Sequence, residues 1–143
     1  MIGVVLATHG ELGQAFIGAM EMIVGAQERV AALSLQVADR LEDATARLQE
    51  AIASADEGDG VLVLTDMLGG TPSNLCLALI GGQRPVEVIS GASLPMLLKA
   101  VQVRREVELR EVAAQVKKVG RGAIIVASEA LAGPESRGGG VAP

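Results

Sequence analysis

Short runs of apolar residues alternate with amphipathic helical stretches along this chain, and this alternation restricts the fold more than any other feature. The sequence predicts strands at residues 1–7, 30–37, 61–64, 86–89 and 123–126, and helices at 11–24, between Asp39 and Ala55, between Thr71 and Gly81, at 94–103 and at 107–119. Such alternation favours βαβ units. We therefore expect an α/β fold with a doubly wound, mostly parallel sheet of strand order 2-1-3-4.

The chain of 143 residues has the length of one domain. Residues 133–143 are rich in glycine and proline and carry no apolar periodicity, which predicts a disordered tail. We expect the domain to span residues 1–132.

Composition excludes several classes of partner and site. The net charge of −5 argues against nucleic acid and against anionic membrane surfaces, which bind basic proteins. With a single histidine and a single cysteine, Cys76, the chain has too few soft ligands for a structural zinc site, and we expect neither a metal nor a cofactor. No apolar run approaches the roughly 20 residues that span a bilayer, and no signal segment precedes the first strand. A cytoplasmic protein without direct membrane insertion is predicted.

Three predicted strands end in residues that could carry chemistry. The first ends at Thr8-His9-Gly10, the third at Thr65-Asp66 and the fourth at Ser90-Gly91. Ligands of doubly wound folds bind beyond the carboxyl ends of the strands, where the strand order reverses. In the order 2-1-3-4 the first and third strands are neighbours, so His9 should lie beside Asp66. A carboxylate that accepts a hydrogen bond from Nδ1 would leave Nε2 as an oriented nucleophile.

The segment after Asp66 suggests what this nucleophile attacks. Gly69 and Gly70 allow close approach of the backbone, and Thr71-Pro72 begins a helix whose free N–H groups favour an anion. Hydroxyl groups near these strand ends could also bind a phosphoryl group, although each could equally serve a turn or a cap: Thr8, Thr65, Thr71, Ser73 and Ser90. We predict phosphate binding by Gly69, Gly70, Thr71, Ser73 and Ser90, with catalytic roles for His9 and Asp66. A phosphocarrier fits these residues better than a kinase that uses ATP.

The same residues resemble a known family. The strand end Thr8-His9-Gly10, the pattern Asp-x-x-Gly-Gly-Thr-Pro-x-Asn from Asp66 to Asn74, and the stretch from Val88 to Leu97 are similar to the enzyme IIA domain of the mannose-family phosphoenolpyruvate-dependent sugar phosphotransferase system. This resemblance covers residues 1 to about 130. Where the family often has an aromatic residue, this chain has Met67-Leu68.

The resemblance implies a role for each of these parts. His9 would be phosphorylated at Nε2 by the phosphocarrier HPr and would pass the group to a IIB domain, with Asp66 as the partner of the imidazole. Residues 123–126 would form an antiparallel strand exchanged between the subunits of a homodimer. Since no second domain follows the tail, we expect a separately encoded IIB partner, and the IIA protein could associate with a membrane permease complex for sugar uptake or serve regulation.

Three other interpretations remain open at this point. The phosphotransfer subunit of dihydroxyacetone kinase has a similar fold and also uses a histidine after the first strand. A histidine phosphatase would need an arginine beside the histidine and a second histidine, whereas Thr8 precedes His9 and no other histidine exists. A non-catalytic regulatory binding domain would keep His9 inert.

Overall fold

The computed structural model describes residues 1–67 and 71–132, and of residues 71–73 it describes the backbone alone. The elements follow the order β1 (Gly3–His9), α1 (Leu12–Val24), β2 (Val30–Leu35), α2 (Leu41–Ala55), β3 (Val61–Thr65), α3 (Thr71–Leu77), β4 (Val86–Ser90), α4 (Leu94–Val103), α5 (Leu109–Gly122) and α6 (Ala127–Leu131). The strands of this described part pair in parallel in the order β2-β1-β3-β4. The predicted α/β class and strand order are confirmed.

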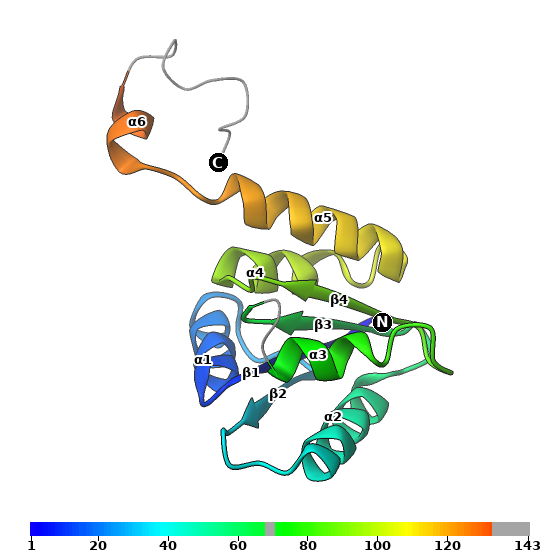
Figure 1. The fold of residues 1–143 in the computed structure, drawn as a ribbon. Coiled ribbons are helices and arrows are strands. Elements are labelled where there is room, and N and C mark those ends of the chain that lie inside the picture. Colours follow the sequence, from blue (N-terminus) through cyan, green and yellow to red (C-terminus); the bar gives the residue numbers. More distant parts are fainter. Residues whose placement is uncertain (68–70, 133–143) are drawn as a thin grey trace.

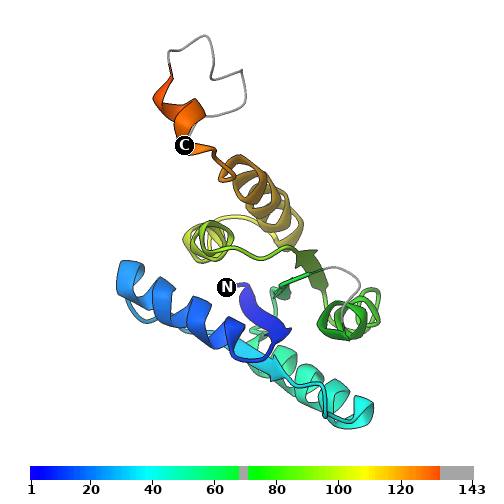
Figure 2. The same cartoon turned by 60° about the vertical axis from the view of Figure 1, so that its left-hand side comes forward.

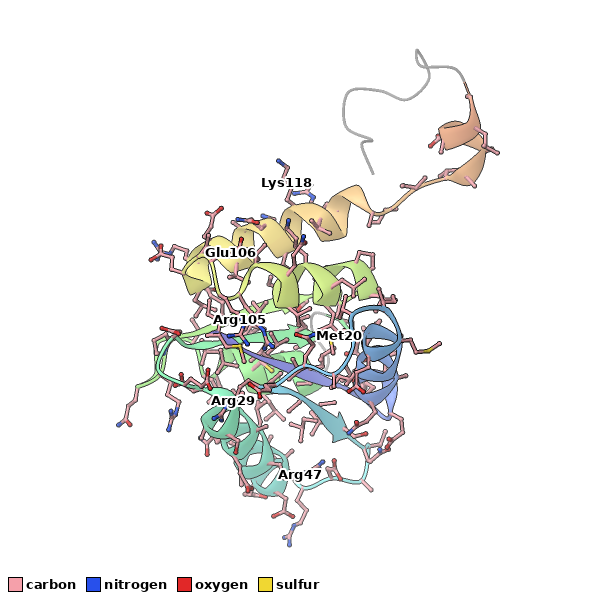
Figure 3. The ribbon with its side chains drawn as sticks, turned by 180° about the vertical axis from the view of Figure 1, so that it is seen from behind. Met20, Arg29, Arg47, Arg105, Glu106 and Lys118 are labelled. Atoms are coloured by element: carbon pink, nitrogen blue, oxygen red, sulfur yellow. The ribbon has the colours of Figure 1, made fainter. Side chains whose placement is uncertain are left out.

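Helices cover both faces of the sheet, as a doubly wound fold requires (Figure 1). On one face α2 and α3 contribute buried side chains such as Leu48, Ile52 and Cys76. On the other face α1, α4 and α5 pack together over the sheet, with Leu97 and Val116 fully buried. Figure 3 shows Met20 pointing from α1 towards this second core. Each buried Val or Leu contributes about 1.5–3 kcal/mol relative to an exposed one, so two such cores stabilise the sheet from both sides.

The two central strands are apolar along almost their whole length because neighbours cover both of their faces. All five residues of β3 are buried, and so are the first six of β1. His9, the last residue of β1, is the first of that strand to be exposed. The register aligns Thr8 of β1 with Ser34 of the edge strand β2, and Ala7 with Thr65 of β3. The strand that carries the histidine is therefore held on both sides.

The start of α2 differs from the prediction. The helix begins at Leu41 with Arg40 as its N-cap, and no side chain caps it. The carboxylate of Asp39, the residue at which the sequence predicts the helix to start, instead accepts a hydrogen bond from the backbone N–H of Gln36 at 2.8 Å. A short polar side chain can close the turn before a helix as readily as it can cap the helix, and here the turn prevails.

The C-terminal part differs from the prediction within the single chain. α5 continues through Gly122, whereas the sequence predicts a helix that ends at residue 119. Residues 123–126 form no strand in this single chain, and the strand exchanged between subunits stays a prediction. A short helix, α6, follows instead. Figures 1 and 2 show α5 leading the chain away from the sheet, so that α6 lies apart from it. A strand needs an edge to pair with, and this segment reaches none within its own chain.

Two remaining predictions concern the tail and the membrane. The predicted tail, residues 133–143, lies outside the described residues, and the domain boundary at residue 132 stays a prediction. Among the residues that the structure does describe, no helix has the length and apolar character to cross a membrane.

Candidate active site

The carboxyl end of β1 delivers His9 to the surface. Thr8, just before it, is fully buried, and its Oγ1 accepts a hydrogen bond from the backbone N–H of Gly13 in the first turn of α1 at 2.8 Å. Gly10, just after it, has a φ of +52°, a left-handed conformation that glycine adopts at little cost. The chain thus reverses sharply into α1 and leaves the His9 side chain 48% exposed.

Asp66 lies directly beyond the carboxyl end of the neighbouring strand β3 and reaches His9. Its Oδ2 accepts two hydrogen bonds from that residue, one from the backbone N–H at 3.0 Å and one from Nδ1 at 2.9 Å. Its Oδ1 accepts a third, from the backbone N–H of Met67, at 3.0 Å. The Asp66 side chain is only 13% exposed. The pairing of His9 with Asp66 that the strand order predicts is therefore present in the structure.

The electrostatics of Asp66 decide which nitrogen of His9 carries the proton. Burial on its own raises the pKa of the Asp66 carboxyl, but hydrogen bonds from the side chain and backbone of His9 outweigh burial and lower that pKa below its ordinary value. An ionised carboxylate can only accept, so the Nδ1 that faces it must be the donor. In the neutral imidazole Nε2 then has the free lone pair, directed away from Asp66.

The carboxyl end of β4, the last of the three predicted strand ends, lies next to that of β3 in the sheet. Ser90, the last residue of β4, accepts a hydrogen bond from the Thr65 hydroxyl at 2.9 Å, and the backbone N–H of Ala92 donates to the Thr65 carbonyl at 2.9 Å. Thr65 itself is fully buried. These contacts tie the β4 exit loop to β3, next to Asp66.

The predicted anion site falls largely outside the described residues. This holds for Gly69 and Gly70, and for the side chains of Thr71 and Ser73. The α3 helix does begin at Thr71, as the Thr-Pro pair predicts. The phosphate-binding roles of these residues stay predictions.

A residue that the sequence did not single out also lies at this site. Ser34, on β2, donates a hydrogen bond to the carbonyl of Gly10, and its Oγ lies 3.1 Å from Oε1 of Glu11. The register that aligns Ser34 with Thr8 brings it there. A polar residue inside an apolar edge strand is a weak signal, because the sequence does not give the register.

In the part of the chain that the structure describes, His9 belongs to no cluster of metal ligands and lines none of three cavities. Within residues 1–67 and 71–132, no three His, Cys, Asp or Glu side chains group so as to hold a metal ion. Three cavities of about 490, 470 and 400 Å³ lie elsewhere on the molecule, and neither His9 nor Asp66 lines any of them.

Comparison with known proteins gives consistent matches. A family model of the EIIA-man family, described as PTS system fructose IIA component, matches residues 3–117. The PTS system mannose-specific EIIAB component of Escherichia coli (strain K12) is 30% identical over 103 residues, which make up 72% of this chain and 32% of that protein. The PTS system fructose-specific EIIA component of Bacillus subtilis (strain 168) is 26% identical over 131 residues, 92% of this chain and 90% of that protein. The chain thus spans about a third of the Escherichia coli relative and most of the Bacillus one.

Solved structures agree with these relatives. The crystal structure of phosphotransferase system component EIIA from Streptococcus agalactiae has a TM-score of 0.82 and 29% identity, covering 90% of this chain and 98% of that one. The mannose/sorbose specific IIA subunit of the phosphotransferase system from Enterococcus faecalis has a TM-score of 0.78 and 28% identity, covering 87% of this chain and 93% of that one. Together with the family match over residues 3–117, these likenesses show that the chain belongs to the mannose family of enzyme IIA components of the sugar phosphotransferase system.

Proposed function

We propose that this chain is a phosphocarrier that accepts a phosphoryl group on Nε2 of His9 and passes it on. The observation that carries the proposal is the 2.9 Å contact between His9 Nδ1 and Asp66 Oδ2 on a half-exposed imidazole. Asp66 holds the proton on Nδ1 and orients the ring, so the Nε2 lone pair faces an approaching donor. Both residues belong to the segments that resemble the family's motifs.

The transfer needs few protein groups. The Nε2 lone pair attacks phosphorus in line, a phosphorus–nitrogen bond forms, and the bond from phosphorus to the donor breaks with its electron pair leaving on the donor. The proton on Nδ1 stays in place, and Asp66 stabilises the positive charge that develops on the ring. Transfer to the acceptor repeats these events with His9 as the leaving group. Gly69, Gly70, Thr71, Ser73 and Ser90 are the groups we propose to contact the phosphoryl oxygens.

The donor we propose is phospho-HPr and the acceptor is a IIB domain. The relatives support this assignment, since the Escherichia coli protein is named an EIIAB component and this chain aligns with about a third of it. The relatives are named as mannose-, fructose- and sorbose-specific components. The proposal therefore concerns the phosphoryl transfer and not a particular sugar. We propose that the reaction takes place in the cytoplasm and that the chain docks to a membrane permease complex.

We further propose a homodimer in which residues 123–126 form an antiparallel strand on the sheet of the partner. Exposed apolar side chains support it, since Ile124 is 82% exposed, Ile125 43% and Val126 56%. An apolar segment that finds no edge in its own chain gains most by pairing with a second copy. Light scattering of the full chain should give twice the monomer mass, whereas a monomer at micromolar concentration contradicts this arrangement.

One experiment tests the phosphocarrier. Incubation with phosphoenolpyruvate, enzyme I and HPr should add one phosphoryl group, labile in acid, to the intact protein, as measured by mass spectrometry. His9→Ala removes the attacking nitrogen and should gain none, while leaving the buried part of β1 unchanged. An unchanged mass of the wild-type protein would overturn the proposal and favour a non-catalytic binding domain.

A further inference from the structure

The residue that follows the histidine is held from the side of β2. The backbone N–H of Gly10 donates to the carbonyl of Leu35 at 2.9 Å, and the Gly10 carbonyl accepts a hydrogen bond from the Ser34 hydroxyl. Both backbone groups of Gly10 are therefore bound by two successive residues of one edge strand. A glycine at a φ of +52° has many alternative conformations, and two hydrogen bonds restrict it to one.

His9 is consequently fixed from two sides. Asp66, beyond β3, binds its backbone N–H and its Nδ1, whereas Ser34 and Leu35 of β2 bind the residue next to it. Asp66 sets the rotation of the ring, but the path of the backbone through Gly10 sets where the ring stands. In-line attack requires the nucleophile within a few tenths of an ångström of its productive position, so both constraints matter for transfer.

The Ser34 hydroxyl has one proton, and two acceptors among the described residues are within its reach. One is the Gly10 carbonyl, which belongs to the fixed backbone, and the other is Oε1 of Glu11 at 3.1 Å. The Glu11 side chain is exposed and water can satisfy its carboxylate, whereas a part-buried carbonyl loses more when its donor is removed. We therefore assign the Ser34 hydroxyl proton to the hydrogen bond with the Gly10 carbonyl.

Ser34 is itself supported from α2 and from its own strand. The Arg47 guanidinium donates to the Ser34 backbone carbonyl at 2.9 Å, and Nε2 of Gln36 lies 3.4 Å from the Ser34 Oγ. Arg47 lies at the α2 side of the molecule in Figure 3. The hydroxyl is thus presented by a strand whose outer edge is held in place, not by a free side chain.

We propose that Ser34 is a positioning residue for the phosphoryl transfer at His9, acting through the carbonyl of Gly10. This inference rests on the proposed phosphocarrier function and adds a residue of β2 to it. Ser34 does not contact the phosphoryl group. It keeps the histidine loop in the conformation from which Nε2 attacks.

The test is the rate of single-turnover transfer from phospho-HPr to the full chain, measured over a range of phospho-HPr concentrations. Ser34→Ala should lower the limiting rate about 3- to 10-fold, the effect of one ordinary hydrogen bond, and leave the half-saturating concentration of phospho-HPr unchanged. Ser34→Thr retains a hydroxyl and should recover most of the wild-type rate. Rates are taken per folded molecule, which is checked by circular dichroism, so reduced stability alone does not alter them.

Two further variants assign the effect to its contact. Glu11→Gln keeps the bond from Ser34 to Gly10 and should transfer at the wild-type rate. Ser54→Ala is the matched control on α2, because the hydrogen bond of Ser54 to another described residue uses its backbone carbonyl, and this variant should transfer at the wild-type rate. A Ser34→Ala rate equal to wild type, a Ser34→Thr rate as low as that of Ser34→Ala, or an equal loss in Glu11→Gln would each overturn the inference.

The outcomes also separate this inference from the function on which it rests. If the wild-type chain gains no phosphoryl group that His9→Ala lacks, the phosphocarrier itself fails. If the wild-type chain is phosphorylated on His9 and the Ser34 variants transfer at its rate, only the role of Ser34 fails.

Discussion

Two aspartates flank β3, and each accepts three hydrogen bonds from residues that the structure describes, with different consequences. Asp56, before the strand, accepts from the backbone N–H groups of Gly58 at 2.8 Å and Gly60 at 3.1 Å and from the Arg84 guanidinium at 3.0 Å. Asp66, after the strand, accepts from two backbone N–H groups and one imidazole nitrogen. Their side chains are 7% and 13% exposed. What separates the two is the chemistry of the third donor.

The third donor decides whether the carboxylate supports structure or reactivity. A guanidinium stays charged and offers no lone pair, so the pair of Asp56 with Arg84 can only hold the loop before β3. An imidazole has a second nitrogen, and binding the first one directs it. The amino end of β3 therefore anchors the fold, and the carboxyl end carries the proposed chemistry.

The largest effect is expected at the anchor. Asp56→Ala leaves two backbone N–H groups and Arg84 without their acceptor and should lower the free energy of unfolding by about 2–3 kcal/mol. Urea unfolding followed by circular dichroism measures this loss. Phosphorylation of the folded variant should remain at the wild-type level. A folded Asp56→Ala protein that is no longer phosphorylated would contradict the division of roles between the two aspartates.

Asp66→Ala should have the opposite profile. We expect phosphoryl transfer to slow about 10- to 100-fold, as is typical when the group that orients a histidine is removed. The loss of stability should be smaller than in Asp56→Ala, because His9 is half exposed and water can replace the carboxylate. Single-turnover kinetics and nitrogen NMR of the imidazole, which reports the proton on Nδ1, test this. Wild-type kinetics in a folded variant would exclude an orienting role.

The glycines at the two ends extend the comparison. Gly60 has a φ of +92°, and a Cβ there would lie 2.8 Å from the Pro85 carbonyl oxygen, so Gly60→Ala should cost about 2–3 kcal/mol of unfolding free energy. Gly10 has a φ of +52°, and among the described residues other than its chain neighbours no heavy atom lies within 4 Å of an added Cβ, so Gly10→Ala should cost only about 1 kcal/mol. Thermal melts of both variants would rank them. Equal losses would show that the two ends are equally constrained.

The smallest effect is expected in the pH dependence of stability. Hydrogen bonding to Gly58, assisted by Arg84, holds the pKa of Asp56 below its ordinary value despite burial, and the pKa of Asp66 is also lowered. A lowered folded-state pKa gives stability that is fully present above the unfolded value of about 4 and is lost as the pH falls through the folded pKa. Urea midpoints should therefore fall below about pH 4 in the wild type and less steeply in Asp56→Asn. If the urea midpoints of the wild type and of Asp56→Asn fall equally with pH, the lowered pKa of Asp56 does not contribute to stability.

The pairing of His9 with Asp66 follows from the sequence because it depends only on strand order. Once β1 and β3 are neighbours, the residues at their carboxyl ends must meet, and His9 and Asp66 are the reactive pair among them. Ser34 could not be found in this way, since its role depends on the register of β2 against β1 and on the direction of one hydroxyl group.

The strand predicted at residues 123–126 is not formed within the single chain, and the reason is of a different kind. Residues 123–126 have the composition of a strand, but a strand forms only where an unpaired edge is within reach. The extension of α5 through Gly122 moves this segment away from its own sheet. The composition of residues 123–126 therefore indicates a strand, but it does not indicate which sheet edge that strand would pair with.

The separation of His9 and Asp66 along the chain affects how well a partly folded chain can be phosphorylated. The two residues are 57 positions apart, and their contact exists only after β3 has docked beside β1. A nascent or partly folded chain holds the same histidine without its orienting carboxylate, so it should be a poor acceptor of phosphoryl groups. Molecules that have completed the central sheet would then be phosphorylated faster than partly folded ones.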